Sequence, residues 1–158
     1  MQIYIMRHGQ AFTSGTSDAL RGLTSQGKLE ANVMAKWIAD KQIPLDEIIV
    51  SPFIRAQETA KELSDNLGKN ILLTTLDFIT PSGSVQHMHD YIDGVCATNK
   101  VNHLLIVSHM PLVSYLLADL TIDGNSPIFQ TAAIAHIDYD IKRMKGQLVS
   151  LISPNDLS

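Results

Sequence analysis

Short apolar runs that alternate with helical patterns constrain the fold of this chain more than any other feature. The runs lie at residues 3–6, 47–50, 71–73 and 104–107, and they are apolar at nearly every position. Such runs are typical of strands whose two faces are both covered by helices. Helices are expected in the stretch before Pro44 and at residues 53–67, 85–97 and 111–120. The alternation predicts an α/β fold, a three-layer sandwich with a mostly parallel central sheet and helices on both faces.

The helix before Pro44 has both a start signal and an apolar face. Thr24 or Ser25 can accept a hydrogen bond from the free N–H groups of its first turn. The face predicted to pack against the sheet carries Leu29, Val33, Trp37 and Ile38. At the other end of the chain, residues 134–139 and 148–152 flank a turn and predict a C-terminal antiparallel strand pair.

Size and charge limit what the protein can be. With 158 residues, 45% of them hydrophobic, the chain fits a single domain over residues 1–158 with a self-sufficient core. Its net charge of -4 argues against general nucleic-acid binding, which needs an excess of Lys and Arg over a surface. No apolar stretch reaches the roughly 18 residues of a membrane span, and the first residues lack the basic flank of a signal peptide. We therefore expect a cytoplasmic protein that does not enter membranes.

The lone cysteine and two neighbouring histidines are read as structural residues. Cys96 excludes an internal disulfide and fits a reducing compartment, and we expect it to be a buried apolar residue on a helix. His87 and His89 lie two apart on the same predicted helix and therefore point in different directions. They are expected to be solvated surface residues rather than a metal pair.

Three of the four arginines lie in segments that can converge on one anion. Arg7 and His8 follow the first apolar run, Arg55 follows the second, and His109 follows the run at 104–107, while Arg21 lies in a surface loop. Because ligands of parallel sheets bind at the carboxyl ends of the strands, we expect these side chains to share one rim. The arginine fork is well suited to a phosphoryl group, since it donates two parallel hydrogen bonds and stays charged. The sequence therefore predicts phosphate chemistry.

Four ordered blocks carry a family resemblance that covers nearly the whole chain. They are IMRHG at residues 5–9, LTSQG at 23–27, VSPFIRA at 50–56 and IVSHMPLV at 106–113. The chain resembles the histidine phosphatase superfamily, whose mark is Arg-His-Gly after the first strand, and is most similar to its SixA-type phosphohistidine phosphatases. This resemblance implies a phosphoglycerate mutase-like fold without the large inserted cap of bigger members.

The resemblance also implies a role for each residue of the predicted site. His8 would attack phosphorus to give a phosphohistidine enzyme intermediate, which water then hydrolyses. Arg7, Arg55 and His109 would hold the phosphoryl oxygens, with Arg21 as a further contact. For the attack, one ring nitrogen of His8 must be neutral while the other donates to a fixed acceptor, expected to be a backbone carbonyl near Gly9. Turnover should then fall on acidification.

Further site residues and alternatives follow from the same segments. Gly9 and Ser108 are additional candidates for substrate binding, although the Ser108 hydroxyl is expected to bond to the backbone. His8, His109 and Arg21 can each also be read as ordinary loop or strand-end residues. No metal ion or cofactor is expected, because no paired carboxylates lie in the site segments.

The leaving group decides between substrate classes. Expelling an alkoxide requires a positioned general acid, whereas a protonated phosphohistidine releases neutral imidazole without one. Asp77 is the one acidic residue of the stretch 76–83 where phosphomonoesterases of the superfamily carry their acid, and a turn carboxylate is the favoured reading. This favours a protein phosphohistidine phosphatase, expected as a monomer, acting on a histidine-phosphotransfer domain or a small phosphocarrier. A small-molecule phosphomonoesterase and a non-catalytic phosphohistidine-binding module remain the alternatives.

Overall fold

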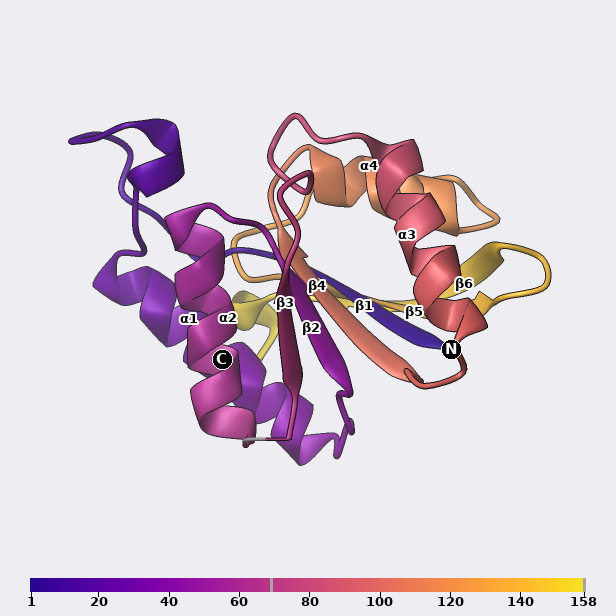
Figure 1. Ribbon diagram of the computed structural model, residues 1–158. Coiled ribbons are helices and arrows are strands. Elements are labelled where there is room, and N and C mark those ends of the chain that lie inside the picture. The colour runs from indigo at the N-terminus through magenta and orange to yellow at the C-terminus, as the bar shows by residue number, and fades with distance from the viewer. Residues whose placement is uncertain (69, 158) are drawn as a thin grey trace.

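The computed structural model describes residues 1–68 and 70–157, and its centre is a six-stranded sheet (Figure 1). The strand order is β3-β2-β4-β1-β5-β6, formed by β1 (Gln2–Arg7), β2 (Glu47–Val50), β3 (Leu72–Thr75), β4 (His103–Ser108), β5 (Ile134–Asp140) and β6 (Lys145–Ile152). The first four strands of this order are parallel, whereas β5 is antiparallel to β1 and β6 is antiparallel to β5. The predicted α/β class and the C-terminal antiparallel pair are confirmed.

Four α-helices and two short 3-10 helices complete the fold. They are α1 (Ser25–Asp40), α2 (Ile54–Leu67), α3 (Val85–Ala97), α4 (Leu112–Leu120), η1 (Asp18–Leu20) and η2 (Pro154–Leu157). Thr24 caps α1 as predicted, since its side chain accepts a hydrogen bond from the Gly27 N–H at 3.0 Å. The loop predicted between the first strand and the first helix contains η1, and its two ends are joined by a bridge between Ala11 and Leu23.

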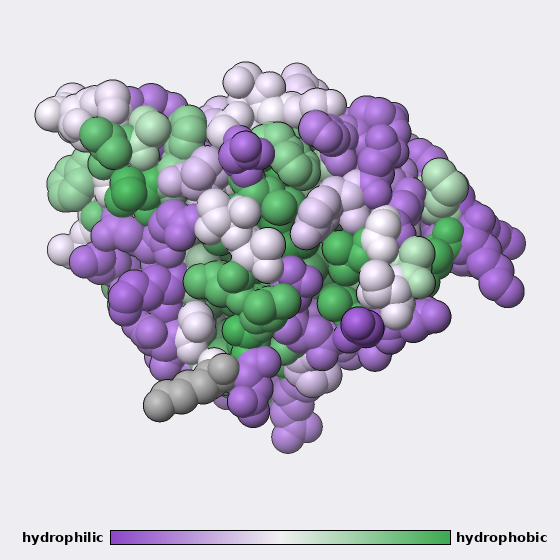
Figure 2. Space-filling view, in the orientation of Figure 1, coloured by the Kyte–Doolittle hydropathy of each residue, from purple (hydrophilic) through white to green (hydrophobic). Residues whose placement is uncertain are grey.

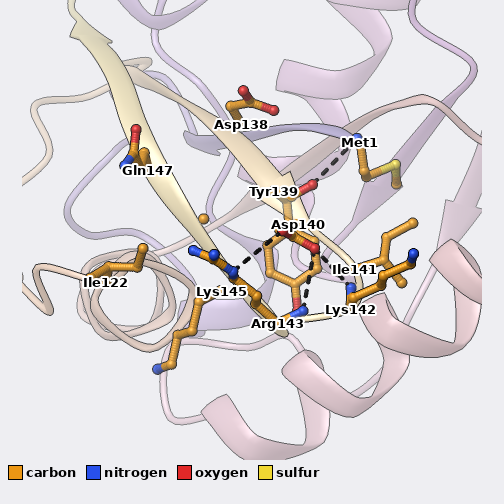
Figure 3. A pocket seen from close by; sticks show the side chains of 11 residues that line it. Met1, Ile122, Asp138, Tyr139, Asp140, Ile141, Lys142, Arg143, Lys145 and Gln147 are labelled. Carbon is orange, nitrogen blue, oxygen red and sulfur yellow. Dashed lines mark hydrogen bonds and ion pairs between the residues drawn. The ribbon is translucent and has the colours of Figure 1, made fainter.

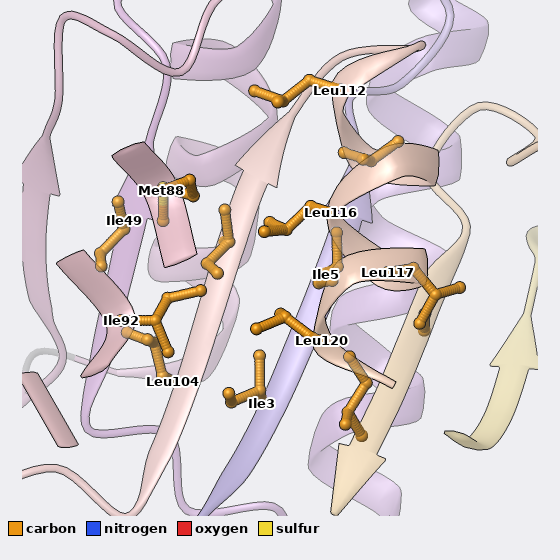
Figure 4. Close-up of a cluster of buried hydrophobic side chains, with 14 of the residues drawn as sticks. Ile3, Ile5, Ile49, Met88, Ile92, Leu104, Leu112, Leu116, Leu117 and Leu120 are labelled. Carbon is orange, nitrogen blue, oxygen red and sulfur yellow. The ribbon is translucent and has the colours of Figure 1, made fainter. Parts of the chain in front are cut away.

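Each face of the sheet builds its own core because successive strand residues point to opposite sides. On one face, Ile3 and Ile5 of β1 pack with residues of α3 and α4, and Figure 4 shows them beside Leu116 and Leu120 of α4. On the other face, the alternate residues of β1 pack against α1 and α2. The central strands are therefore covered on both sides, which explains why their sequences are apolar at consecutive positions.

The buried face of α1 differs from the predicted one. Leu29 is 57% exposed, whereas small residues such as Ala31 and Ala35 are fully buried with Met34. The packing is closest in the first turn, where a side chain on Gly27 would lie 2.0 Å from the Gln10 carbonyl oxygen. Of the four predicted residues, Ile38 alone is fully part of the buried face.

The third strand is also displaced from its predicted position and burial. It begins at Leu72 and ends at Thr75 instead of spanning residues 71–73. Because β3 is an edge strand, Leu72 and Leu73 remain 60% and 43% exposed. Figure 2 shows green hydrophobic side chains in the middle of this face, in front of the β3 edge.

His89 is a buried cross-link between elements, so the prediction that it is solvated was wrong. Its Nδ1 lies 2.5 Å from Oδ2 of Asp119 in α4, and its Nε2 lies 2.9 Å from the hydroxyl of Tyr139 in β5. That hydroxyl donates to Asp93 in α3 at 2.6 Å. Every polar atom of the imidazole thus has a partner, which is how a polar ring is accommodated at a packed junction. His87 is exposed as predicted.

Two further sequence expectations can be compared with the fold. Cys96 is buried on α3 as predicted, and burial raises the pKa of its thiol to about 11. Among the described residues, the helices are too short or too polar to span a bilayer.

Candidate active site

The predicted phosphate-binding residues meet in one cleft at the carboxyl ends of β1, β2 and β4. Arg7 ends β1 and His8 follows it, His109 follows β4, and Arg55 lies in the first turn of α2 just after β2. With Arg21 they line a cavity of about 440 Å³. The rings of His8 and His109 are 5.1 Å apart between centroids. Side chains from positions as distant as 7 and 109 therefore share one pocket.

The hydrogen bonds of His8 define which ring nitrogen carries the proton. Nδ1 lies 2.6 Å from the carbonyl oxygen of Gly9, which can only accept, so the proton is on Nδ1. Arg55 Nε donates to Nε2 at 3.2 Å, so Nε2 carries a lone pair. Burial is the main reason that the pKa of His8 is lowered to about 4, and the Arg55 charge lowers it further. At neutral pH the ring is neutral and carries its lone pair on Nε2.

Two buried donors in the same cleft have no hydrogen-bond partner. They are Nε of Arg7 and Nδ1 of His109, and no other buried side-chain nitrogen or oxygen of the described residues is left unpaired. Arg7 is fixed because its Nη1 donates to the Phe129 carbonyl at 2.8 Å. His109 is fixed by a 2.7 Å contact between its Nε2 and the Ser51 hydroxyl. We assign the hydroxyl as the donor of this bond, because its oxygen already accepts from the Phe53 N–H, so the proton of the neutral His109 ring lies on Nδ1. Unpaired buried polar atoms are costly, so this pair marks a place where an acceptor fits.

Arg55 and Arg21 are bridged by a carboxylate that the sequence did not single out. Asp18 of η1 accepts from Arg55 Nη2 at 3.3 Å and pairs through its other oxygen with Arg21 Nη2. Its backbone carbonyl accepts from Arg55 Nη1 at 2.6 Å. The hydrogen bond from Arg21 is the main reason that the pKa of Asp18 is lowered, so Asp18 is ionised at neutral pH. The arginines already hold an anionic group at this point of the cleft.

Comparison with known proteins agrees with this geometry. Residues 3–77 match the model of the histidine phosphatase superfamily (branch 1). The phosphohistidine phosphatase SixA of Escherichia coli (strain K12) is 38% identical over 89% of this chain and 86% of its own. The chain belongs to the histidine phosphatase superfamily. The SixA homolog of Haemophilus influenzae is 35% identical over 89% of both chains, and a solved structure of SixA complexed with tungstate superposes with a TM-score of 0.95 at 35% identity over all of both chains.

In this member of the superfamily, the polar groups of Gly9 and the hydroxyl of Ser108 are bonded to other groups of the protein. The Gly9 N–H donates to Thr59 Oγ1 at 3.0 Å, and its carbonyl accepts from His8. A side chain on Gly9 would lie 2.5 Å from the Gly27 carbonyl oxygen, so the residue serves close packing of the loop against α1. The buried Ser108 hydroxyl donates to the Ile79 carbonyl at 2.8 Å. Neither residue lines the cleft, and both hold the loops that position the histidines.

The structure adds positioning residues that sequence reasoning missed. Ser51 could have been found by the same rule that located His109, because it is a polar residue directly after a buried strand. Thr59 lies three residues after the block at 50–56, but nothing in the sequence shows that it supports Gly9. The role of the Phe129 carbonyl could not be found from the sequence, because every residue has a backbone carbonyl, whatever its side chain.

The low pKa of His8 gives a pH prediction. Nuclear magnetic resonance titration of the imidazoles is expected to show His8 losing its ring proton near pH 4, far below the roughly 6.5 of an unperturbed histidine. If the neutral ring acts as the nucleophile, phosphatase activity should decline on acidification only as the pH approaches 4. The assignment is made by the resonance that disappears in His8→Gln. An inflection near 6.5 for His8 would contradict the predicted electrostatics.

Asp77 gives a second prediction. Its side chain is exposed and is not among the residues that line the cleft. Replacing Asp77 with Asn should therefore change turnover of a phosphohistidine protein by less than about twofold, as is usual for exposed sites without a structural role. Steady-state kinetics on a phosphohistidine substrate measures this, and a hundredfold loss would show that Asp77 acts as the general acid.

A second cavity, of about 540 Å³, lies at the opposite end of the parallel strands (Figure 3). It is larger than the cleft, but several of its polar groups are paired with one another. The Met1 amine donates to the Tyr139 carbonyl, and the backbone N–H groups of Lys142 and Arg143 donate to Asp140. Because its lining lacks the buried unpaired donors found around His8, we locate the active site in the smaller cleft.

Proposed function

We propose that this protein is a phosphohistidine phosphatase that removes the phosphoryl group from a histidine of another protein through a phosphohistidine intermediate on His8. The observation that carries the proposal is the neutral His8 with its Nε2 lone pair held by Arg55, in a cleft that also contains two unpaired buried donors. A loose phosphoryl-transfer transition state is stabilised chiefly by positioning and by cationic donors. The guanidiniums of the cleft supply those donors.

In the first step, Nε2 of His8 attacks phosphorus while the bond to the substrate's imidazole nitrogen breaks. The electron pair of that bond returns to the substrate ring, which leaves as neutral imidazole. The phosphorylated His8 is cationic because Nδ1 keeps its proton, and the Gly9 carbonyl stabilises that charge. In the second step, water attacks phosphorus, the electron pair returns to Nε2, and inorganic phosphate carries away the proton of the water.

The charged groups of the cleft support P–N rather than P–O cleavage. Among the described residues that line it, Asp18 is the one carboxylate, and its lowered pKa keeps it ionised. An ionised carboxylate cannot protonate an alkoxide leaving group. Imidazole needs no such acid, because it leaves from a protonated ring as a weak base.

The relatives support the substrate class and leave the individual partner as our inference. SixA is called a phosphohistidine phosphatase in Escherichia coli, and the superposed SixA structure holds tungstate, a tetrahedral oxyanion. We infer a partner that carries phosphohistidine, either a histidine-phosphotransfer domain of a sensor kinase or a small phosphocarrier. We also infer cytoplasmic residence, which fits the single buried thiol of Cys96.

The experiment that tests this function compares two substrates and traps the intermediate. The purified protein is mixed with a ³²P-labelled phosphohistidine protein, quenched in alkali within milliseconds, and digested for mapping of acid-labile phosphate. We expect phosphate on the peptide that contains His8. We also expect kcat/KM for the phosphohistidine protein to be at least about a hundredfold higher than for a sugar phosphate, because the alkoxide leaving group of a sugar phosphate requires a general acid.

Each alternative gives a different result. Equal or faster turnover of the sugar phosphate would indicate a small-molecule phosphomonoesterase. Tight binding of the phosphohistidine protein without release of phosphate would indicate a binding module.

A further inference from the structure

The carboxylate of Asp18 occupies the arginine cluster in a way that the proposed reaction does not explain. Two of the three nitrogens of Arg55 bind Asp18, one through the side chain and one through the backbone carbonyl, and the third binds His8. Arg55 is 5% exposed and therefore has little room to turn elsewhere. Both terminal nitrogens of its fork face Asp18, so a phosphoryl group that is to be held by that fork competes with Asp18 for it.

Asp18 is also the attachment point of its loop. Residues 13–18 and Leu20 are exposed, and the loop that contains η1 projects beyond α1 and α2 (Figure 1). Among the hydrogen bonds of the described residues, those that join residues 13–20 to another element are both made by Asp18 with Arg55. The ends of the loop are fixed separately by the bridge between Ala11 and Leu23. The tip can therefore move away without disturbing the rest of the fold.

We propose that Asp18 sets the affinity threshold of the phosphoryl pocket: it is an internal counter-ion that a ligand must displace to bind the fork of Arg55. The inference rests on the phosphoryl pocket of the proposed function. The cost of displacement is subtracted from the binding free energy of every anion. The attraction between a phosphoryl dianion and the guanidiniums exceeds this cost, so the dianion still binds. The attraction of a monoanion, such as a phosphodiester or a sulfate ester, is about half as large, so monoanions bind weakly.

Two oxyanions of the same shape but different charge distinguish displacement from simple repulsion. Tungstate is a tetrahedral dianion and perrhenate is a tetrahedral monoanion. If Asp18 leaves, removing its charge strengthens both ligands by the same factor, because the same contacts are broken in each case. If Asp18 stays and repels, the gain in binding free energy is twice as large for the dianion as for the monoanion.

The test is isothermal titration of wild-type protein and Asp18→Asn with both anions, at constant ionic strength and at mildly alkaline pH, where tungstate stays monomeric. We expect Asp18→Asn to bind each anion about five- to tenfold more tightly, since two partly exposed ion pairs are lost. Asp18→Glu, which keeps the charge, should remain within about threefold of wild type. The matched control is Asp65→Asn, which removes an exposed carboxylate paired with Lys61 on the same helix as Arg55. It should leave both affinities unchanged.

Several outcomes would overturn the proposal. Unchanged or weaker binding in Asp18→Asn would show that Asp18 orients the arginines instead of competing for them. A gain for tungstate near the square of the gain for perrhenate would show that Asp18 stays in place. Failure of the wild-type protein and of Asp18→Asn to bind tungstate at all would overturn the phosphoryl pocket itself and, with it, the proposed function.

Hydrogen exchange gives a readout that does not depend on affinity. The Leu20 N–H donates to the Ser17 carbonyl within η1. If ligand displaces Asp18, exchange at Leu20 should accelerate in wild-type protein on addition of tungstate, and it should already be fast in free Asp18→Asn. Slower exchange in the presence of tungstate would contradict displacement.

Discussion

Replacing His8 with Ala is expected to abolish turnover of a phosphohistidine protein, with kcat/KM falling at least about 10⁴-fold. The variant has no atom in place of Nε2 that can bond to phosphorus, so the covalent path is lost completely. The arginines and His109 remain, and the variant should still bind the substrate. The acid-labile label found after rapid quenching should therefore disappear while substrate affinity persists.

The controls for His8→Ala separate loss of the nucleophile from loss of the fold. His87→Ala removes an exposed histidine from α3 and should leave kcat/KM within about twofold of wild type. Thermal unfolding should show that His8→Ala is folded, because the neutral ring contributes no buried ion pair. Residual turnover within tenfold of wild type, with label still present, would place the nucleophile on another residue such as His109.

Replacing Arg55 with Ala is expected to lower kcat/KM about 10³-fold, the upper end of what loss of one preorganised donor costs. Under the proposed function Arg55 has two tasks: its Nε donates to Nε2 of His8, and its charge stabilises the transferred phosphoryl group. Loss of both affects the transition state more than the ground state, so kcat should fall more than KM rises. Steady-state kinetics with the phosphohistidine protein measures the two terms.

Arginine variants of matched chemistry test the interpretation. Arg143 is the fourth arginine of the chain, and its side chain is 75% exposed near Asp140, so Arg143→Ala should change kcat/KM by less than about twofold. Arg55→Lys keeps the charge without the planar fork, and its kcat/KM should be about tenfold higher than that of Arg55→Ala. A loss of less than tenfold in Arg55→Ala would mean that Arg7 and Arg21 hold the phosphoryl group without it.

The fold was predictable where burial on both faces leaves a clear pattern in the sequence. The strand at residues 47–50 is fully buried and was located at its observed bounds. The bounds of the third strand were predicted wrongly because an edge strand is less buried than a central one. Leu72 and Leu73 are both apolar and both exposed, so their hydrophobicity does not indicate where the strand lies. The face of α1 was misassigned because hydrophobicity was used to locate it, whereas close helix packing selects small residues such as Ala31.

The site was predictable to the extent that its residues lie at strand ends. The strand-end rule brought Arg7, His8, Arg55 and His109 to one rim, and the structure places them in one cleft. Asp18 was not predicted as a site residue, because it does not follow a strand. It lies in a loop without periodicity, and its partner Arg55 is 37 positions away. A contact of this kind, between a loop and the first turn of a helix, depends on how the chain packs in three dimensions, which local sequence patterns do not specify.

The support of Arg7 by the Phe129 carbonyl has a consequence for how the protein is made. The two residues are 122 positions apart, and the His8 carbonyl likewise accepts from the N–H of Ala132. During synthesis on the ribosome, the backbone that holds the loop of His8 emerges 122 residues after Arg7. The nascent chain therefore cannot preorganise this anion-binding loop until the segment at residues 129–132 has been made.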